Sequence, residues 1–155
     1  MAVYEIKVTH DDGNAIVEDF MEKEWKSSNL ENFGRVLARE EFRSPLTLTA
    51  WGTGDEQELL GVARCTVMGN TVIVHQLLVK TEKRRKAGIG SALLKEVEQL
   101  CIENGWHKIR LSTSEKHANI GFYHKNGYEK ETTLHNDAFG LTWFILAKYP
   151  LKKKK

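Results

Sequence analysis

Residues 71–101 read TVIVHQLLVKTEKRRKAGIGSALLKEVEQLC, and this stretch decides the fold. Its first nine residues are rich in β-branched side chains and predict a mostly buried strand, Thr71–Val79. Its last part repeats apolar residues at helical spacing and predicts a helix from about Ser91 to Glu103. A basic loop with two glycines, residues 85–91, joins them. Because a helix N-terminus offers unpaired N–H groups and partial positive charge, this loop is suited to bind an anion such as a pyrophosphate.

The bulk composition is that of one globular domain. The chain has 155 residues, 41% of them apolar and 28% charged, and a net charge of +2, which gives no case for general nucleic-acid binding. Cys65 and Cys101 stand alone in apolar stretches and are expected to be buried free thiols. No apolar run approaches the roughly 18 residues of a membrane span. We therefore expect a single cytoplasmic domain over residues 1–150, with a disordered basic tail at 151–155.

The turn and capping residues along the rest of the chain predict the element order β-α-α-β-β-β-α-β-α-β-β. A first strand is expected over Val3–Thr9, followed by a cap at residues 11–14 and a helix with an apolar core stripe. Residues 27–29 are expected to break that helix, so that a second one carries Leu30, Phe33, Val36 and Leu37. Further strands are expected at 45–51, 59–68, 107–112, 128–134 and 141–149, and a short helix at 119–125. This order predicts an α/β fold in which helices cover both faces of a mixed, largely antiparallel sheet.

Two segments together resemble one enzyme family. The string Arg85-x-x-Gly88-x-Gly90 after a strand resembles the acyl-coenzyme A loop of the GNAT N-acetyltransferases. Residues 119–128, NIGFYHKNGY, resemble the segment N-x-x-x-Y-x-K-x-G-F/Y of the same family. The two matches occur in the order and at the spacing of the family, and the predicted elements agree with its fold along the whole chain.

The resemblance implies acetyl-CoA as co-substrate, and the scattered histidines predict no metal site. The pyrophosphate would lie on the loop, formed by Arg84, Arg85, Lys86, Ala87, Gly88, Ile89, Gly90 and Ser91. The pantetheine arm would pair with backbone groups of Leu78, Val79 and Lys80 at a bulge, and Asn119, Phe122 and Lys125 would also contact the cofactor. One residue more than the usual family spacing separates Val79 from the loop motif. Either Arg84 or Arg85 could therefore be the main phosphate contact.

The resemblance assigns Tyr123 as the general acid towards the coenzyme A sulfur, because a phenol with a pKa near 10 is protonated at neutral pH. The general base is less determined, because the strand offers no glutamate. His75 is the candidate on that strand, since an imidazole pKa of about 6.5 suits the task. Glu40, Glu41, His117 and a water relay stay open. The six histidines have no ligand partners at metal-binding spacing.

The expected function is acetyl transfer from acetyl-CoA to a primary amine of a small molecule, by direct attack in a ternary complex. Two alternatives stay open: a protein lysine or N-terminal acetyltransferase, and a non-catalytic acyl-CoA sensor, which the missing strand glutamate favours. We expect no nucleic-acid or membrane partner. Dimers are common in the family, so a homodimer is a further expectation.

Overall fold

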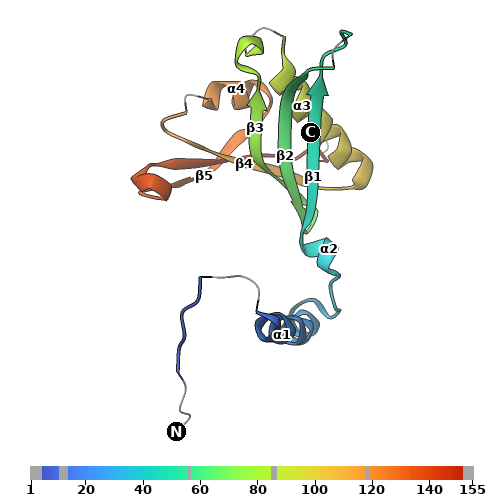
Figure 1. Ribbon diagram of the computed structural model, residues 1–155, viewed down its shortest axis with the longest axis vertical. Coiled ribbons are helices and arrows are strands. Elements are labelled where there is room, and N and C mark those ends of the chain that lie inside the picture. The colour runs from blue at the N-terminus through green and yellow to red at the C-terminus, as the bar shows by residue number, and fades with distance from the viewer. Residues whose placement is uncertain (1–4, 11–13, 56, 85–86, 118, 152–155) are drawn as a thin grey trace. The chain divides into compact units, whose positions relative to one another are not determined.

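A six-stranded sheet organises the larger of two units in the computed structural model (Figure 1). The structure describes residues 5–10, 14–55, 57–84, 87–117 and 119–151. One unit is Met1–Ala38 and the other is Arg39–Lys155. The helices are α1 (Ala15–Phe33), α2 (Arg39–Phe42), α3 (Ile89–Asn104) and α4 (Ile120–Lys125), with 3₁₀ turns at Thr81–Lys83 and Ala138–Gly140. The strands are β1 (Ser44–Trp51), β2 (Leu59–Met68), β3 (Thr71–Val79), β4 (Lys108–Ser114), β5 (Glu129–Leu134) and β6 (Trp143–Lys148).

The first unit contains one long helix rather than two short ones. Helix α1 begins at the predicted cap, where the Asn14 side chain accepts a hydrogen bond from the Ile16 amide at 2.9 Å. The predicted break at residues 27–29 is wrong, because the helix continues to Phe33 and ends at Gly34 in the left-handed conformation (φ 69°). Serine and asparagine lower helix propensity only modestly, and Asn32 Nδ2 donates to the Ser28 carbonyl one turn earlier.

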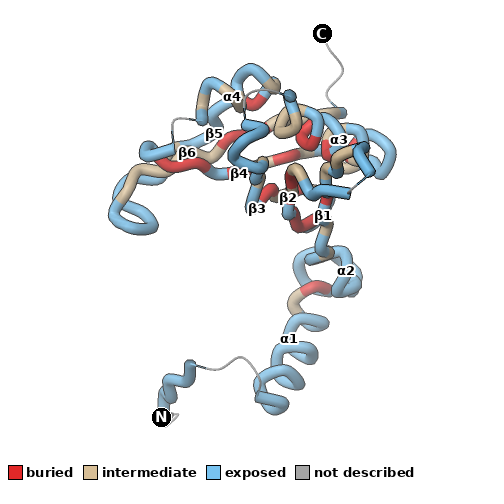
Figure 2. Tube along the Cα trace, turned by 45° about the horizontal axis from the view of Figure 1, so that its top comes forward, coloured by how far each residue is buried: buried red, intermediate tan, exposed pale blue. Residues whose placement is uncertain are grey.

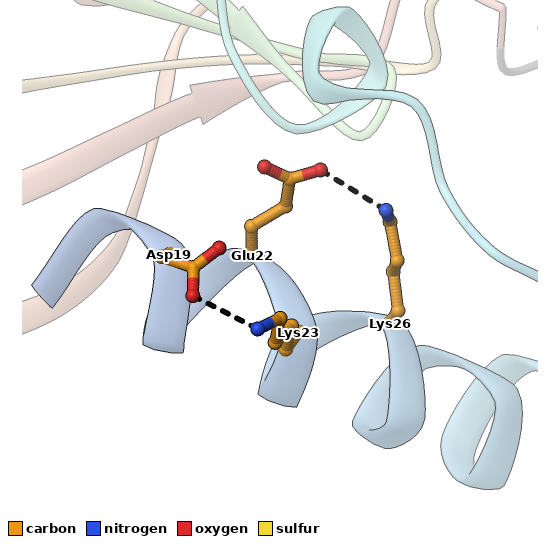
Figure 3. Close-up of polar contacts among 4 residues, drawn as sticks. All are labelled: Asp19, Glu22, Lys23 and Lys26. Carbon is orange, nitrogen blue, oxygen red and sulfur yellow. Dashed lines mark hydrogen bonds and ion pairs between the residues drawn. The ribbon is translucent and has the colours of Figure 1, made fainter. Parts of the chain in front are cut away.

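Salt bridges along α1 support it locally. Lys23 contacts Asp19 at 2.9 Å and Lys26 contacts Glu22 at 3.0 Å, each four residues apart (Figure 3). Such exposed pairs contribute only about 0.3–0.5 kcal/mol each. They favour the helix without giving the unit a core.

Two expectations for this unit are not met within it. The apolar stripe on α1 was expected in a core, but the unit itself leaves Ile16, Phe20 and Trp25 exposed, and Asn29 is its only buried residue among those described. A single helix has no second layer within its own unit against which to bury a stripe. The expected first strand is also missing from its described part, residues 5–9. Alternation supplies the period of a strand but not the neighbour that must take its hydrogen bonds.

The second unit confirms the predicted mixed sheet. Its strand order is β1-β2-β3-β4-β6-β5, and every neighbouring pair is antiparallel except β3 with β4. The predicted bounds of β2 and β3 agree with the structure, and the other strands shift by a few residues. Gly69 and Asn70, both with positive φ, form a tight hairpin between β2 and β3.

Helix α3 packs on one face of this sheet and forms the core with it (Figure 2). Leu94, Val97 and Cys101 of α3 are buried together with Val72 and Ile109 of the central strands. The two cysteines are free and buried as predicted, and burial raises the pKa of Cys65 to about 11 and that of Cys101 to about 12. Among the described helices, none combines the length and apolar character needed to cross a membrane.

The contact between β2 and α3 at Gly61 tests this packing. A Cβ at this position would lie 2.8 Å from Ile89 Cγ2 and 3.2 Å from Leu93 Cδ1. We predict that Gly61→Ala lowers the free energy of unfolding by about 1–3 kcal/mol, because the helix must shift to avoid overpacking. Urea denaturation measures the change. Gly54→Ala is the matched control and should stay within about 0.5 kcal/mol, because nothing lies within 4 Å of its added Cβ. Equal stabilities of the two variants would contradict this packing.

Candidate functional site

The two central strands part beyond Val74 of β3 and Leu111 of β4. They pair in parallel only from Thr71 with Lys108 to Val74 with Leu111. Strand β3 nevertheless continues to Val79 along β2, and β4 continues to Ser114 along β6. One edge of each strand is therefore without its sheet neighbour over these last residues. We call this gap between the ends of β3 and β4 the splay.

A bulge at His75 decides which backbone groups face the splay. Cys65 pairs with Val74 and Arg64 pairs with Gln76, so His75 is the extra residue on β3. The Lys80 amide donates to the Leu60 carbonyl at 2.8 Å, which directs the groups of Lys80 towards β2. Because backbone groups alternate along a strand, those of Leu77 and Val79 point to the opposite edge, into the splay.

This geometry changes the expected pantetheine contacts. The prediction that Lys80 offers free backbone groups is wrong. Its amide donates to the Leu60 carbonyl, and its carbonyl accepts from the Lys83 amide at 2.9 Å. Leu78 pairs with Val62 and shares the β2-facing register of Lys80. The groups that face the splay belong instead to Leu77, which was not predicted from sequence, and to Val79, which was. The bulge also lies earlier than expected, at His75 rather than at the strand end.

The loop after β3 places a cation at this edge. Arg84 Nε donates to the Val79 carbonyl at 3.0 Å, so its guanidinium lies across the open end of the strand. The 3₁₀ turn Thr81–Lys83 lies between the end of β3 and Arg84. Arg85 and Lys86, two of the predicted phosphate contacts, lie outside the described residues.

The start of α3 supplies unpaired backbone donors. Gly88 is its N-cap, in the left-handed conformation (φ 65°), and no side chain caps the helix. The amides of Ile89, Gly90 and Ser91 therefore have no partner within the helix, whose first intrahelical bond runs from Ala92 to the Gly88 carbonyl at 2.9 Å. Ala87 and Gly88 are exposed beside them. An anion site is predicted from the sequence at this position, and the free amides are compatible with it.

Helix α4 meets the start of α3. A Cβ on Gly90 would lie 3.1 Å from Phe122 Cζ and 3.7 Å from Val79 Cγ2, so the end of β3, the start of α3 and α4 converge at this glycine. Asn119 precedes α4, and its side chain does not cap the helix. Lys125 is exposed in the last turn of α4. The structure thus brings Val79, Gly90 and Phe122 together.

Tyr123 is half-buried in this group. Its ring contacts those of Phe122, at 5.1 Å between centroids, and Tyr128, at 6.1 Å. Burial raises the pKa of Tyr123 above its ordinary value of 10.0, because the phenolate would lose hydration there. The hydroxyl therefore keeps its proton at neutral pH.

His75 lies on the sheet face opposite α3. Its Nε2 is 2.8 Å from Thr66 Oγ1 on β2, and the Thr66 side chain is buried. Thr66 pairs with Ile73, on the face away from the core residues Cys65 and Val74. The bulge thus gives His75 a side-chain direction opposite to that of Leu77 and Val79.

A second histidine lies at the end of β4. His117 Nδ1 is 2.7 Å from Ser114 Oγ, and Ser114 is buried. Neither this pair nor Thr66 was identified from sequence. Only the proximity of Ser114 and His117 in the chain could have suggested it, whereas Thr66 and His75 meet through strand pairing.

The comparisons with known proteins decide the family. The family model described as Acetyltransferase (GNAT) family matches residues 14–128. The chain belongs to the GNAT acetyltransferase family. A search of curated proteins gives no match.

Solved structures of GNAT acetyltransferases share this fold. An acetyltransferase from Bacillus cereus is 21% identical with a TM-score of 0.65, covering 92% of this chain and 97% of its own. The aminoglycoside 6'-N-acetyltransferase from Enterococcus faecium is 20% identical with a TM-score of 0.61, covering 94% and 97%. An aminoglycoside 6'-N-acetyltransferase complexed with coenzyme A is 18% identical with a TM-score of 0.61, with the same coverage.

Tyr128, which follows α4 in this acetyltransferase, provides a stability test. It is 1% exposed, and its hydroxyl has no hydrogen-bond partner among the described residues. An unsatisfied buried hydroxyl costs about 1–3 kcal/mol, so we predict that Tyr128→Phe raises the free energy of unfolding by about 1 kcal/mol. Tyr149→Phe is the opposite control, because the Tyr149 hydroxyl donates to Glu131 at 2.9 Å and its loss should lower stability. A loss of stability in Tyr128→Phe would show that its hydroxyl is bonded.

Proposed function

We propose that this acetyltransferase moves the acetyl group of acetyl-CoA to a primary amine of a small molecule, by direct attack within a ternary complex. The observation that carries the proposal is the open edge of β3, which ends beside the unpaired amides of α3. Coenzyme A matches both features, because it joins an amide-containing arm to a pyrophosphate.

Separate groups of residues match the pantetheine arm and the pyrophosphate of coenzyme A. The backbone groups of Leu77 and Val79 would pair with the pantetheine amides, as an added strand would. The amides of residues 88–91 would hold the pyrophosphate. Arg84 would move from the Val79 carbonyl to the phosphates, which would free that carbonyl for the pantetheine. A structure of the same fold complexed with coenzyme A supports this assignment.

The bound co-substrate supplies an acetyl thioester. In the balanced reaction a bond forms between the amine nitrogen and the acetyl carbon, the carbon–sulfur bond breaks, the nitrogen loses a proton and the sulfur gains one. Tyr123 is the proposed donor to the sulfur, since its raised pKa keeps a proton on Oη. Asn119, which precedes α4, and Phe122 and Lys125 of α4 are further proposed contacts of the co-substrate.

His75 is the proposed acceptor of the amine proton. Its pairing with Thr66 gives this role a physical basis, because a ring whose Nε2–H donates to Thr66 Oγ1 leaves Nδ1 free as the base. Thr66 is then a positioning residue that selects the tautomer. His117 is the alternative base, and Ser114 holds its Nδ1 in the same manner.

An acceptor screen tests the proposed function. Purified protein is incubated with acetyl-CoA and a panel of small amines, polyamines and peptides, and thiol release is followed. We expect release with at least one small amine. Binding of acetyl-CoA without release for any amine would support a sensor, and peptides that outcompete the small amines would support a protein-directed enzyme.

Tyr123→Phe tests the general acid. We predict that kcat falls about 10²-fold, because the sulfur loses its positioned donor, while the Kd of acetyl-CoA changes by less than about threefold. Steady-state kinetics and calorimetry measure the two values. Equal kcat values for the variant and wild type at every pH would remove Tyr123 from this role.

His75→Gln and Thr66→Val test the base together. We predict that His75→Gln lowers kcat by about 10²-fold and removes the acidic limb of the pH–rate profile. Thr66→Val should lower kcat by several-fold while that limb remains, because the imidazole stays but loses its preferred tautomer. Loss of the limb in His117→Gln and its survival in His75→Gln would transfer the role to His117.

A further inference from the structure

A pocket between α3, the end of α4 and the end of β6 lies outside the residues that the proposed mechanism uses, apart from Ser91 and Lys125. Its volume is about 470 Å³. It is lined by Ser91, Ala92, Leu94, Lys95, Glu98, Lys125, Asn126, Gly127, Tyr128 and Lys148. Three lysines from three separate elements thus line one pocket.

Lys148 and Glu98 form the fixed wall of this pocket. Lys148 Nζ contacts Glu98 Oε2 at 2.6 Å and donates to the Asn126 carbonyl at 3.0 Å, and both side chains are about three-quarters buried. A Cβ on Gly127 would lie 3.1 Å from that Nζ, so the glycine leaves room for the lysine. The ammonium also lies 5.9 Å from the centre of the Tyr128 ring. Strand β6, helix α3 and the turn after α4 are therefore tied together.

The other two lysines have no acidic partner among the residues that the structure describes. Lys95 and Lys125 are exposed, and neither has an ion-pair partner within the described part of the chain. Since Glu98 balances Lys148, the pocket keeps a net charge of about two positive units. A phosphate monoester carries about −1.5 to −2 at pH 7 and matches this excess.

The position of the pocket favours one of the phosphate groups of coenzyme A. Ser91, which belongs to the unpaired start of α3, also lines the pocket. Lys95 follows one turn later, about 6 Å along the helix axis. In coenzyme A a single ribose connects the pyrophosphate to the 3′-phosphate, so the two groups are separated by a similar span.

We propose that Lys95 and Lys125 bind the 3′-phosphate of coenzyme A in the pocket between α3 and α4, and that they make the enzyme select coenzyme A over its 3′-dephospho form. This inference rests on the proposed function, because it assumes that the pyrophosphate lies on the start of α3. Lys148 and Glu98 position the pocket wall.

The test compares the Kd of coenzyme A with that of 3′-dephospho-coenzyme A by calorimetry. Wild type should bind coenzyme A about tenfold more tightly, since hydrogen bonds to a charged group of this kind are worth about that factor. The double variant Lys95→Ala with Lys125→Ala should lose this preference, and its affinity for the dephospho form should change by less than about twofold. Lys116→Ala, an exposed lysine outside the pocket, is the matched control and should keep the preference.

The outcomes separate this inference from the proposed function. Equal affinities of wild type for the two ligands, or equal weakening of both in the double variant, would overturn the 3′-phosphate site and leave the coenzyme A site intact. Binding of neither ligand to wild type would overturn the proposed function as well. Circular dichroism checks that the variants fold, as expected because both lysines are exposed.

Discussion

The site depends on the early end of the pairing between the two central strands, β3 and β4. Parallel pairing between β3 and β4 stops at Val74 and Leu111, although both strands continue. Each strand keeps its other neighbour, so the splay leaves one open edge of backbone groups without unfolding either strand. Because unpaired N–H and C=O groups are costly unless water or a ligand satisfies them, such an edge is a binding feature of the fold.

The bulge at His75 and the start of α3 both make use of this edge. The bulge changes the register, so that the groups of Leu77 and Val79 face the splay and the His75 ring faces away from the core. Gly90 then allows α3 to begin close to Val79 and Phe122. A side chain at Gly90 would push α3 away from α4. The free amides at the start of α3 would then lie farther from Tyr123.

The sequence predicted the sheet and the loop because both depend on local signals. The β-branched run of β3, the Gly69-Asn70 hairpin and the glycines of the α3 cap each determine structure within a few residues. The wrong predictions concern segments whose structure depends on a neighbouring strand or layer. Residues 5–9 alternate like a strand but form none, and the stripe of α1 has the period of a core helix without burial in its unit.

The candidate site was predictable to the same extent. Tyr123 and the start of α3 follow from local motifs, whereas the contact of His75 with Thr66 and the free groups of Leu77 depend on strand register. A one-residue bulge reverses every side-chain direction after it. Sequence spacing alone therefore could not show which backbone groups of β3 are open.

The most direct measurement is amide hydrogen exchange with and without coenzyme A, read at single residues by NMR. We predict that the Leu77 and Val79 amides exchange fast in the free protein and become protected when coenzyme A binds. The Lys80 amide, already bonded to Leu60, should be protected in both states. Binding of coenzyme A that leaves the Leu77 and Val79 amides unprotected would contradict the claim that the open edge of β3 holds the co-substrate.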